Sequence, residues 1–493
     1  MELSDIVRRR QMDPTEKLLE FDSLASDALP LTPPEAEKTE RLGALQKLDH
    51  EIERIGVGPF HYYCLALLGL GNASDAVEIL CIGYILPVYP EEVSAFTKGT
   101  LTASVFAGML VGGILCGLFG DRIGRKNCLL ASVGINAVFG IMSAFSVNIV
   151  MLVVCRIFAG IGVGGTVPSI FTIATEILPV HKRGFYITVV AWHWMVGQLF
   201  TAGIAWILLG SLGLSWRIFA LTCAIPASLC FFLCLFFLPR SPRWLAMAGD
   251  FNGCCQVLSA AASMNNVKFS PEEILNLAEI EQASDEIESR KDNRQSWVKL
   301  YSPSLIRSTL LLQLSWFALS FGSYGLMVWI PSIFENSGFK LDSYQDAFFV
   351  AAANLPGNIL SSLLMDRVGR KAVLAGGMTL ASLSALLFAF ESNVTLVVLA
   401  ACSFNMFSIG GWNALDCLSA ESFPTTVRTS AMGALAASGR VGSIVAQFVN
   451  GSLEERSIAT LLLTTAAVMC FGALVCLFLP KDPTNKQLEM NVK

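Results

Sequence analysis

Twelve apolar runs limit what this chain can fold into more than any other feature of its sequence. A run of about 20 apolar residues is long enough to cross the roughly 30 Å hydrocarbon core of a bilayer as one helix. Because a helix satisfies its backbone hydrogen bonds internally, such runs predict an all-α membrane protein with twelve transmembrane helices. We expect the spans near residues 61–88, 99–119, 127–147, 149–177, 185–209, 216–238, 305–331, 344–365, 371–391, 394–420, 429–450 and 457–479.

The composition agrees with a chain that is covered by a lipid bilayer. Of its 493 residues, 54% are hydrophobic and 15% are charged, whereas a soluble domain carries about 25% charged residues to solvate its surface. The formal net charge of −5 gives no reason to expect nucleic acid as a partner. The sequence has no phosphate-binding Gly-Lys loop, no metal-ligand spacing and no nucleophile elbow. We therefore expect no cofactor, no metal and no enzyme activity.

An internal repeat is the strongest evidence on the organisation of the chain. The segment Asp121-Arg122-Ile123-Gly124-Arg125-Lys126 returns as Asp366-Arg367-Val368-Gly369-Arg370-Lys371, and 366 minus 121 is 245. A second set returns with the same displacement: Glu176, Pro179 and Arg183 recur as Glu421, Pro424 and Arg428. Two separate motifs that share one displacement of half the chain predict a duplication, with two six-helix bundles of parallel topology.

These observations divide the chain into five parts. We place a cytosolic tail at 1–59, a six-helix bundle at 60–238, a charged cytosolic linker at 239–304, a second six-helix bundle at 305–479 and a second tail at 480–493. The first tail is mostly polar and contains no apolar segment typical of a signal peptide. We therefore expect both termini in the cytosol, with the chain in the plasma membrane or in the membrane of an intracellular vesicle.

The basic residues agree with this orientation, because cytosolic loops of membrane proteins carry an excess of Lys and Arg. The loops on the side of the linker, which also holds an acidic, helix-prone segment at Glu272–Glu288, contain Arg122, Arg125, Lys126, Lys182, Arg183, Arg367, Arg370, Lys371 and Arg428. The loops on the other side contain Lys98, Arg217, Lys340 and Arg456.

The loop motif resembles a known signature. Gly117-x-x-x-Asp121-Arg122-x-Gly124-Arg125-Lys126 resembles the loop between helices 2 and 3 of the major facilitator superfamily (MFS), and the copy at 366–371 resembles its counterpart in the second half. The resemblance covers residues 55 to about 485. It implies the MFS fold, in which two pseudo-symmetric six-helix bundles move a small solute across a membrane.

Further motifs resemble one group within this superfamily, which contains synaptic-vesicle-protein-related (SVOP-like) proteins, organic-ion carriers and sugar porters. The SVOP-like branch is favoured by Ile55-Gly56-Val57-Gly58-Pro59-Phe60 ahead of Asp75-Ala76-Val77-Glu78, and by Phe321-Gly322-Ser323-Tyr324-Gly325. Features shared with sugar porters are Arg156 ahead of the Gly160–Gly165 run, and Ser241-Pro242-Arg243-Trp244-Leu245. The C-terminal sugar-porter motif is degraded to Pro480-Lys481-Asp482-Pro483-Thr484, which weakens the case for a hexose.

Ionisable side chains inside the spans are informative, because lipid tolerates them only when they face a cavity or a partner. Asp75 and Glu78 lie three residues apart, on one face of the first helix. Two close carboxylates can take up a proton, so we predict a proton-coupling site with Arg156 as its partner. The resemblance to proton-coupled sugar porters assigns the pairing acid to Asp75, whereas depth in the helix makes Glu78 an equal candidate. The alternative is a permanently paired structural charge.

Arg440 lies in the middle of the eleventh run. Its rigid guanidinium fork matches a carboxylate or phosphate, and in organic-ion carriers this region tends to be basic when the solute is an anion. We therefore predict contact with an anionic solute. The alternative is a structural pair with an acid of the tenth helix, such as Asp416.

Other polar and aromatic residues predict the lining of a solute pocket. In the tenth helix, Asn405, Trp412, Asn413 and Asp416 fall within an arc of about 100° and form one polar stripe. The fifth helix adds Trp192, His193, Trp194 and Gln198, the seventh adds Gln313, Trp316 and Tyr324, and the eighth adds Asn354 and Asn358. Each of these alone is more often a packing residue; together they predict a pocket.

The repeated loop motifs predict a gate rather than a solute site. They place charges at cytosolic helix ends, where charge pairs can hold one conformation. The gate residues are Asp121, Arg122, Arg125, Glu176 and Arg183, with their counterparts Asp366, Arg367, Arg370, Glu421 and Arg428. Gly108-x-x-x-Gly112 and Gly160-x-x-x-Gly164 predict close helix contacts.

We conclude from the sequence that the chain is a secondary transporter of a small organic solute, with a proton as coupling ion. An organic anion is the first expectation, and a sugar, a polyol or an organic cation is the alternative within transporters. The rival from another class is a non-transporting vesicle or receptor protein on the same scaffold. We expect a monomer.

Overall fold

The computed structural model describes residues 47–91, 93–269, 299–336, 343–391 and 393–480. Twelve helical spans in these residues are long and apolar enough to cross a membrane, which confirms the predicted all-α membrane fold. The acidic segment Glu272–Glu288 and Lys340 lie outside the described residues.

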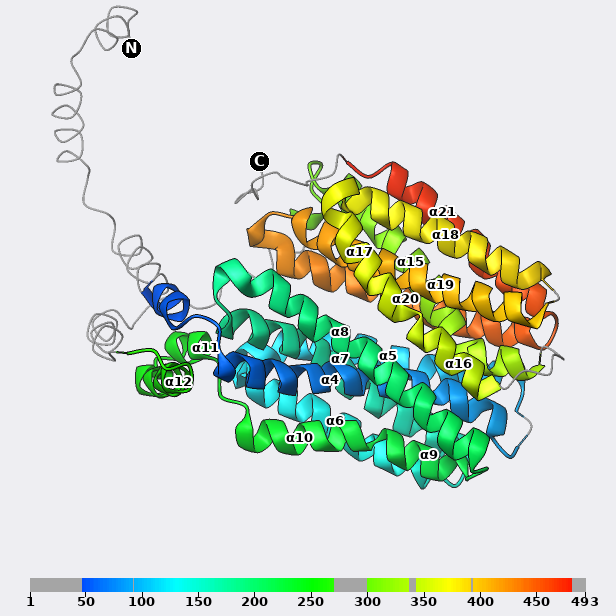
Figure 1. Cartoon of the computed structure of the whole chain (residues 1–493), viewed down its shortest axis with the longest axis horizontal. Helices are drawn as coiled ribbons and strands as arrows, with labels where there is room; N and C mark the ends of the chain where they lie inside the picture. Colours follow the sequence, from blue (N-terminus) through cyan, green and yellow to red (C-terminus); the bar gives the residue numbers. More distant parts are fainter. Residues whose placement is uncertain (1–46, 92, 270–298, 337–342, 392, 481–493) are drawn as a thin grey trace, which may run out of the picture.

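The first half of the chain forms one bundle, coloured from blue to green in Figure 1. Its first five spans are α4 (Pro59–Ile85) with the short η1 (Leu86–Val88), α5 (Ala95–Ile123), α6 (Arg125–Ala144), α7 (Ile149–Ile177), and η2 (Val180–Lys182) with α8 (Arg183–Ala205) and the π-helix η3 (Trp206–Ser211). The sixth span consists of α9 (Trp216–Cys223) and α10 (Ile225–Phe237), which meet at Ala224. Pro226 in the first turn of α10 lacks a backbone N–H, which explains the interruption.

The second half forms the other bundle, coloured from green to red in Figure 1. It contains α15 (Ile306–Asn336), an eighth span made of α16 (Ser343–Ala352) and α17 (Asn354–Val368), then α18 (Arg370–Phe390), α19 (Val394–Glu421), α20 (Thr425–Glu454) and α21 (Ile458–Leu477). Pro356 stands in the first turn of α17, so both halves interrupt one span beside a proline.

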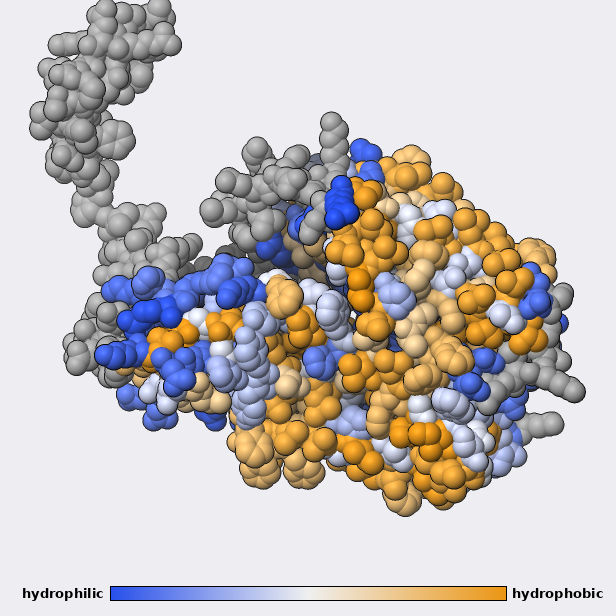
Figure 2. All heavy atoms as spheres, in the orientation of Figure 1, coloured by the Kyte–Doolittle hydropathy of each residue, from blue (hydrophilic) through white to orange (hydrophobic). Residues whose placement is uncertain are grey.

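The outer surface of the bundles is apolar, as a lipid-facing surface must be. Phe232, Phe236 and Phe390 are 56%, 72% and 72% exposed, and orange side chains cover the bundles in Figure 2. Apolar patches on monomeric soluble proteins rarely exceed a few hundred Å². The blue surface in Figure 2 gathers at the left end, over the helix at 47–55 and over α11 (Pro242–Met247) and α12 (Phe251–Met264).

Close helix contacts within the first bundle depend on glycine. A Cβ at Gly108 would lie 2.1 Å from the Ile157 carbonyl oxygen, and a Cβ at Gly160 would lie 2.2 Å from that of Val105. α5 and α7 therefore pack backbone to backbone, as the two Gly-x-x-x-Gly pairs predict.

The two loop motifs lie at the same end of the molecule, which we call the motif end. Gly124 ends α5 and begins α6 with φ of +86°, and Gly369 joins α17 to α18 with φ of +96°. Only glycine adopts these angles without strain, which explains its place in both copies. The other end of the molecule is called the opposite end.

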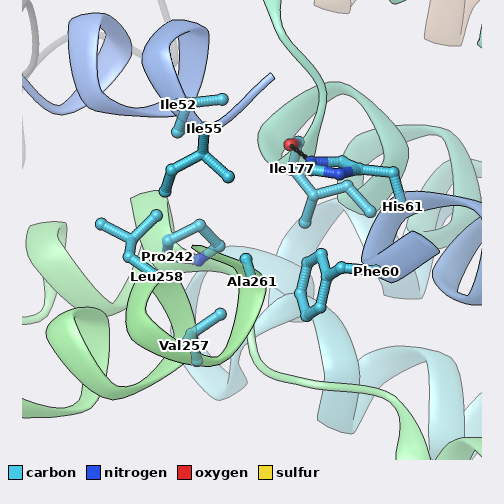
Figure 3. Close-up of a pocket in the computed structure, with 9 residues that line it drawn as sticks. All are labelled: Ile52, Ile55, Phe60, His61, Ile177, Pro242, Val257, Leu258 and Ala261. Carbon is cyan, nitrogen blue, oxygen red and sulfur yellow. Dashed lines mark hydrogen bonds between the residues drawn. The ribbon is translucent and has the colours of Figure 1, made fainter. Parts of the chain in front are cut away.

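Three short helices cover the first bundle at the motif end. Figure 3 shows Ile52 and Ile55 of the 47–55 helix facing Leu258 of α12 and Phe60 of α4 across a small cavity of about 10 Å³. Ion pairs and hydrogen bonds reinforce this contact: Arg243 pairs with Asp49 at 2.5 Å, and the Glu53 carboxylate accepts from the Val180 N–H at 2.6 Å and pairs with His181. The end of the predicted first tail and the start of the predicted linker thus pack on the first bundle.

The two bundles meet at the opposite end and in the middle of the molecule. Lys98 of α5 pairs with Glu454 of α20 at 3.1 Å, and a Cβ at Gly83 of α4 would lie 2.2 Å from the carbonyl oxygen of Val328 in α15. Further contacts between the bundles in these two regions include the Asn354–Gln198 hydrogen bond and several ring contacts. The molecule is therefore closed at the opposite end.

Candidate transport site

A buried ion pair joins α4 to α7. Arg156 donates to the Glu78 carboxylate at 2.6 Å and to the Ser143 hydroxyl at 2.7 Å, and it also contacts the Cys81 sulfur at 2.8 Å. Glu78 is 3% exposed and Arg156 is 1% exposed. Of the two acids left open by the sequence, Glu78 is therefore the one that pairs with Arg156 in this conformation, one helical turn beyond Asp75.

Asp75 is buried without a direct ionic contact. Asp75 is 0% exposed, and neither of its carboxylate oxygens has a hydrogen-bond partner among the described residues. The charges of Arg440 and Glu78 and the Thr166 hydroxyl act on it electrostatically. A buried carboxylate without such a partner is costly, and this distinguishes Asp75 from the paired Glu78.

An aromatic cluster centred on Tyr324 lies where the two bundles meet. The Tyr324 ring lies 5.4 Å from the ring of Phe106, 6.2 Å from that of Trp194 and 5.6 Å from that of Trp412. Trp412 in turn lies 5.4 Å from Trp316 at an edge-to-face angle of 79°. Since α5, α8, α15 and α19 each contribute a ring, both bundles build this cluster.

Hydrogen bonds fix two of these rings in place. The indole N–H of Trp412 donates to the Ser323 hydroxyl at 2.9 Å, and that of Trp316 donates to the Ser419 hydroxyl at 2.9 Å. A buried indole needs such a partner, so both rings are held at defined angles. The cluster is a preformed apolar surface with few remaining donors of its own.

Arg440 places a positive charge on this cluster. Its guanidinium carbon lies 5.7 Å from the centre of the Tyr324 ring, a cation–π distance. Within the described part of the chain it has no ion pair closer than 4.0 Å. Asp416 interacts with Arg440 electrostatically rather than by direct contact, and its side chain is exposed.

Amide side chains of the fifth, eighth and tenth spans hydrogen bond with one another. Asn413 donates to Asn358 at 2.9 Å and to the Ser361 hydroxyl at 2.8 Å. Asn354 donates to Gln198 of the other bundle, so this hydrogen bond crosses the interface.

Three predicted lining residues lie away from the cluster. Gln313 donates to Tyr301, just before the start of α15 and near the motif end, and Asn405 donates to the Val350 carbonyl oxygen at 2.6 Å as a helix-packing contact. Trp192 is 37% exposed, and among the described residues it makes no ring contact or hydrogen bond. Sequence reasoning missed Phe106 and Ser323, because a single aromatic or hydroxyl residue in an apolar helix carries no distinguishing signal.

The residues predicted to form a gate make the same contacts twice. Arg125 pairs with Glu176 at 3.0 Å, and Arg370 pairs with Glu421 at 3.3 Å. In the first bundle, Glu176 thus pairs with Arg125 and not with Arg183.

The remaining gate residues repeat their contacts as well. Arg183 donates to the Leu178 carbonyl oxygen at 3.2 Å, and Arg428 donates to that of Phe423 at 3.3 Å. Every one of these contacts stays within one bundle. Arg122 and Arg367 each lie in the last turn of a helix, and the side chains of Asp121 and Asp366 lie outside what the structure describes.

The two pseudo-symmetric six-helix bundles, with a cluster built from both, define a transporter of the MFS class. The family model for sugar (and other) transporters matches residues 66–491, and the chain belongs to this family of transporters, which are not enzymes. It is a multi-pass integral membrane protein.

Curated relatives agree with the SVOP-like resemblance. Synaptic vesicle glycoprotein 2A of Rattus norvegicus is 26% identical, over 88% of this chain and 79% of the relative. Synaptic vesicle glycoprotein 2C of Mus musculus is 24% identical, over 89% and 81%.

Solved structures share the fold. The inward open conformation of the xylose transporter XylE from E. coli has a TM-score of 0.67 at 19% identity, over 87% of this chain and 99% of that one. Its partially occluded inward open conformation has a TM-score of 0.66 at 19% identity, over 86% and 100%.

Proposed function

We propose that this chain is a secondary transporter that works by alternating access and carries a small organic solute with a carboxylate group, together with a proton. The observation that carries this proposal is Arg440, whose guanidinium lies on the aromatic cluster without an ion pair among the described residues. A guanidinium inside a span needs an anionic partner in at least one state. A solute carboxylate supplies that partner and matches the planar fork of donors.

The proton site of this proposal is Asp75, supported by the Glu78–Arg156 pair next to it. When Asp75 is ionised, its charge offsets that of Arg440, with which it interacts. A proton on Asp75 removes this competition, so the positive field of Arg440 acts on the solute. Proton and carboxylate then favour each other's binding, which is the coupling that symport requires.

Alternating access follows from the duplicated architecture. With the motif end in the cytosol, as the basic loops predict, the described conformation is closed on the outer side. Opening that side requires the Lys98–Glu454 pair and the Gly83 contact to separate. The Arg125–Glu176 and Arg370–Glu421 pairs would act as latches that set how each bundle presents its motif end.

Uptake into proteoliposomes tests the proposal. The panel holds monocarboxylates, nicotinate, sugars and organic cations, each with and without an inward proton gradient. We expect uptake of a carboxylate that the gradient accelerates. Arg440→Lys keeps the charge but loses the fork, so the apparent affinity should fall about tenfold or more. Carboxylate uptake that is unaffected by Arg440→Lys and Arg440→Gln would contradict the proposal.

A neutral sugar or polyol is the second candidate, because amide side chains of both bundles hydrogen bond across the interface. Asn413, Asn358 and the Asn354–Gln198 hydrogen bond offer donors and acceptors suited to hydroxyl groups. In the same panel, sugar uptake that depends on Asn358 and Asn413 but not on Arg440 would favour this candidate.

A further inference from the structure

Arg440 contacts the aromatic cluster, and Asp416 lies one helical turn from it on α19; the two opposite charges do not contact each other. Arg440 of α20 lies over the Tyr324 ring. Asp416 of α19 follows Trp412 by four residues and Asn413 by three, and therefore shares their face of the helix. Trp412 is itself in contact with Tyr324, and Asp416 feels the charge of Arg440. Both charges therefore act on the space beside the same rings.

The structure does not use these two charges as a structural bridge. In the described residues, neither side chain has an ion pair within 4.0 Å. Asp416 is exposed although it belongs to an apolar, 28-residue helix. A structural pair of this kind would be buried and hydrogen bonded, as Glu78 and Arg156 are.

The charge balance around the cluster constrains what can bind there. Glu78 and Arg156 neutralise each other. With a proton on Asp75, as the proposed function requires, the remaining charges are one positive at Arg440 and one negative at Asp416. A solute with a carboxylate alone leaves Asp416 without a partner, and a solute with a cation alone leaves Arg440 without one. A solute with both groups satisfies both residues.

The rings add a preference for the kind of cation. Aromatic faces attract cations and recognise methylated ammonium groups well, because these bring both positive charge and apolar surface. Trp412, Tyr324 and Trp316 lie at steep angles to one another, so they present faces and edges in several directions. Asp416 lies one helical turn from Trp412 on α19, whereas Arg440 belongs to α20.

We propose that the site takes a zwitterion, a small solute whose carboxylate meets Arg440 and whose methylated ammonium group meets Asp416 and the rings of Trp412 and Tyr324. This inference rests on the proposed function, because it keeps the carboxylate at Arg440. It adds a second recognition element and gives Asp416 a role in specificity.

Matched probes isolate the positive charge. Trimethylammonioacetate and 3,3-dimethylbutanoate have the same shape and the same carboxylate, but only the first carries a cation. Trimethylammonioacetamide keeps the cation and replaces the carboxylate with an amide. A longer pair, 4-trimethylammoniobutanoate and 5,5-dimethylhexanoate, tests the same contrast at a second spacing between the charged groups. Binding of each probe to the purified full chain is measured across a pH series on both sides of neutrality, so that Asp416 is ionised in part of the series.

At one of the two spacings or both, the zwitterion should bind at least about tenfold more tightly than its carbon isostere. Asp416→Asn should remove that difference and leave the isostere unchanged, whereas Arg440→Gln should weaken zwitterion and isostere alike. Glu91→Gln, an exposed acid near the opposite end, is the matched control and should change neither.

Each contrary result has a separate meaning. Isosteres that bind as well as zwitterions at both spacings would overturn this inference and leave the carboxylate transporter intact. Tightest binding of the amide would overturn it in favour of a cation site. If no carboxylate binds the wild-type chain, the proposed function fails together with it. A preference for the zwitterion that survives Asp416→Asn would also overturn the assignment of Asp416.

Discussion

The ion pair between Lys98 and Glu454 should control how often the molecule opens at the opposite end. The Glu454 side chain is 1% exposed and accepts from the Ser332 hydroxyl at 2.5 Å, while Lys98 approaches it from the other bundle and is 22% exposed. Removing one partner of a fully buried pair costs about 3–5 kcal/mol. Because Lys98 reaches solvent and Ser332 stays in place, we expect about 2 kcal/mol for Lys98→Met, or roughly a 30-fold change in the equilibrium.

Distances between spin labels across the opposite end measure this equilibrium. Labels at Ser215→Cys and Arg456→Cys, both exposed and in different bundles, report closure once the exposed Cys470 is replaced. A Gly83→Ala background destabilises the closed state, because the added Cβ would lie 2.2 Å from the Val328 carbonyl oxygen. The closed and open states should then both be populated enough to be measured. In that background, Lys98→Met should enlarge the long-distance population, and the swap Lys98→Glu with Glu454→Lys should reverse the change. Identical distributions with and without Lys98→Met would refute the reasoning.

Three further predictions concern the buried pair, the gate and the covering helices. Glu78→Gln leaves the buried Arg156 without its carboxylate and should lower the free energy of unfolding of the purified protein by about 3–5 kcal/mol, seen as a lower melting temperature. The double variant Glu78→Gln with Arg156→Met should recover stability. An unchanged melting temperature of the single variant would contradict this prediction. Arg125→Ala should change the accessibility of cysteine probes from the two membrane faces while solute affinity stays constant, so a fall in affinity alone would argue against a gate role. Burial opposes ionisation of Glu53, but hydrogen bonds from His181 and from the Val180 N–H prevail and lower its pKa below the ordinary 4.5. The stabilising contribution of Glu53 is therefore present at neutral pH and lost as the pH falls through the folded pKa. The difference in melting temperature between wild type and Glu53→Gln should shrink with acidification. A difference that stays constant would be inconsistent with a lowered pKa of Glu53.

Most of the fold could be predicted from the sequence, because lipid imposes one solution on long apolar runs. The displacement of 245 residues reappears in three dimensions: Arg125 and Arg370 make equivalent ion pairs, and Arg183 and Arg428 make equivalent hydrogen bonds. Interruptions of single spans were harder to predict. The proline at 226 has this effect, whereas Pro168 and Pro331 stand inside continuous helices.

The site was predictable in its chemistry and less so in its contacts. Spacing placed Asp75 and Glu78 on one face, but only the positions of α4 and α7 in space decide that Glu78 reaches Arg156. Helical periodicity collected the stripe of α19, but it could not separate Trp412, which touches Tyr324, from Asn405, which binds a backbone carbonyl group. Such choices depend on which neighbour lies opposite, and a single sequence does not contain that information.

The pH dependence of carboxylate affinity tests the central claim most directly, namely that a proton on Asp75 releases Arg440 for the solute. We would measure the dissociation constant of a transported carboxylate for the purified wild-type chain and for Asp75→Asn across a pH series. Wild type should bind more tightly as the pH falls. Asp75→Asn should bind at every pH with nearly the affinity that wild type reaches only in acid. A variant that keeps the wild-type pH dependence, or that loses carboxylate binding altogether, would contradict the account.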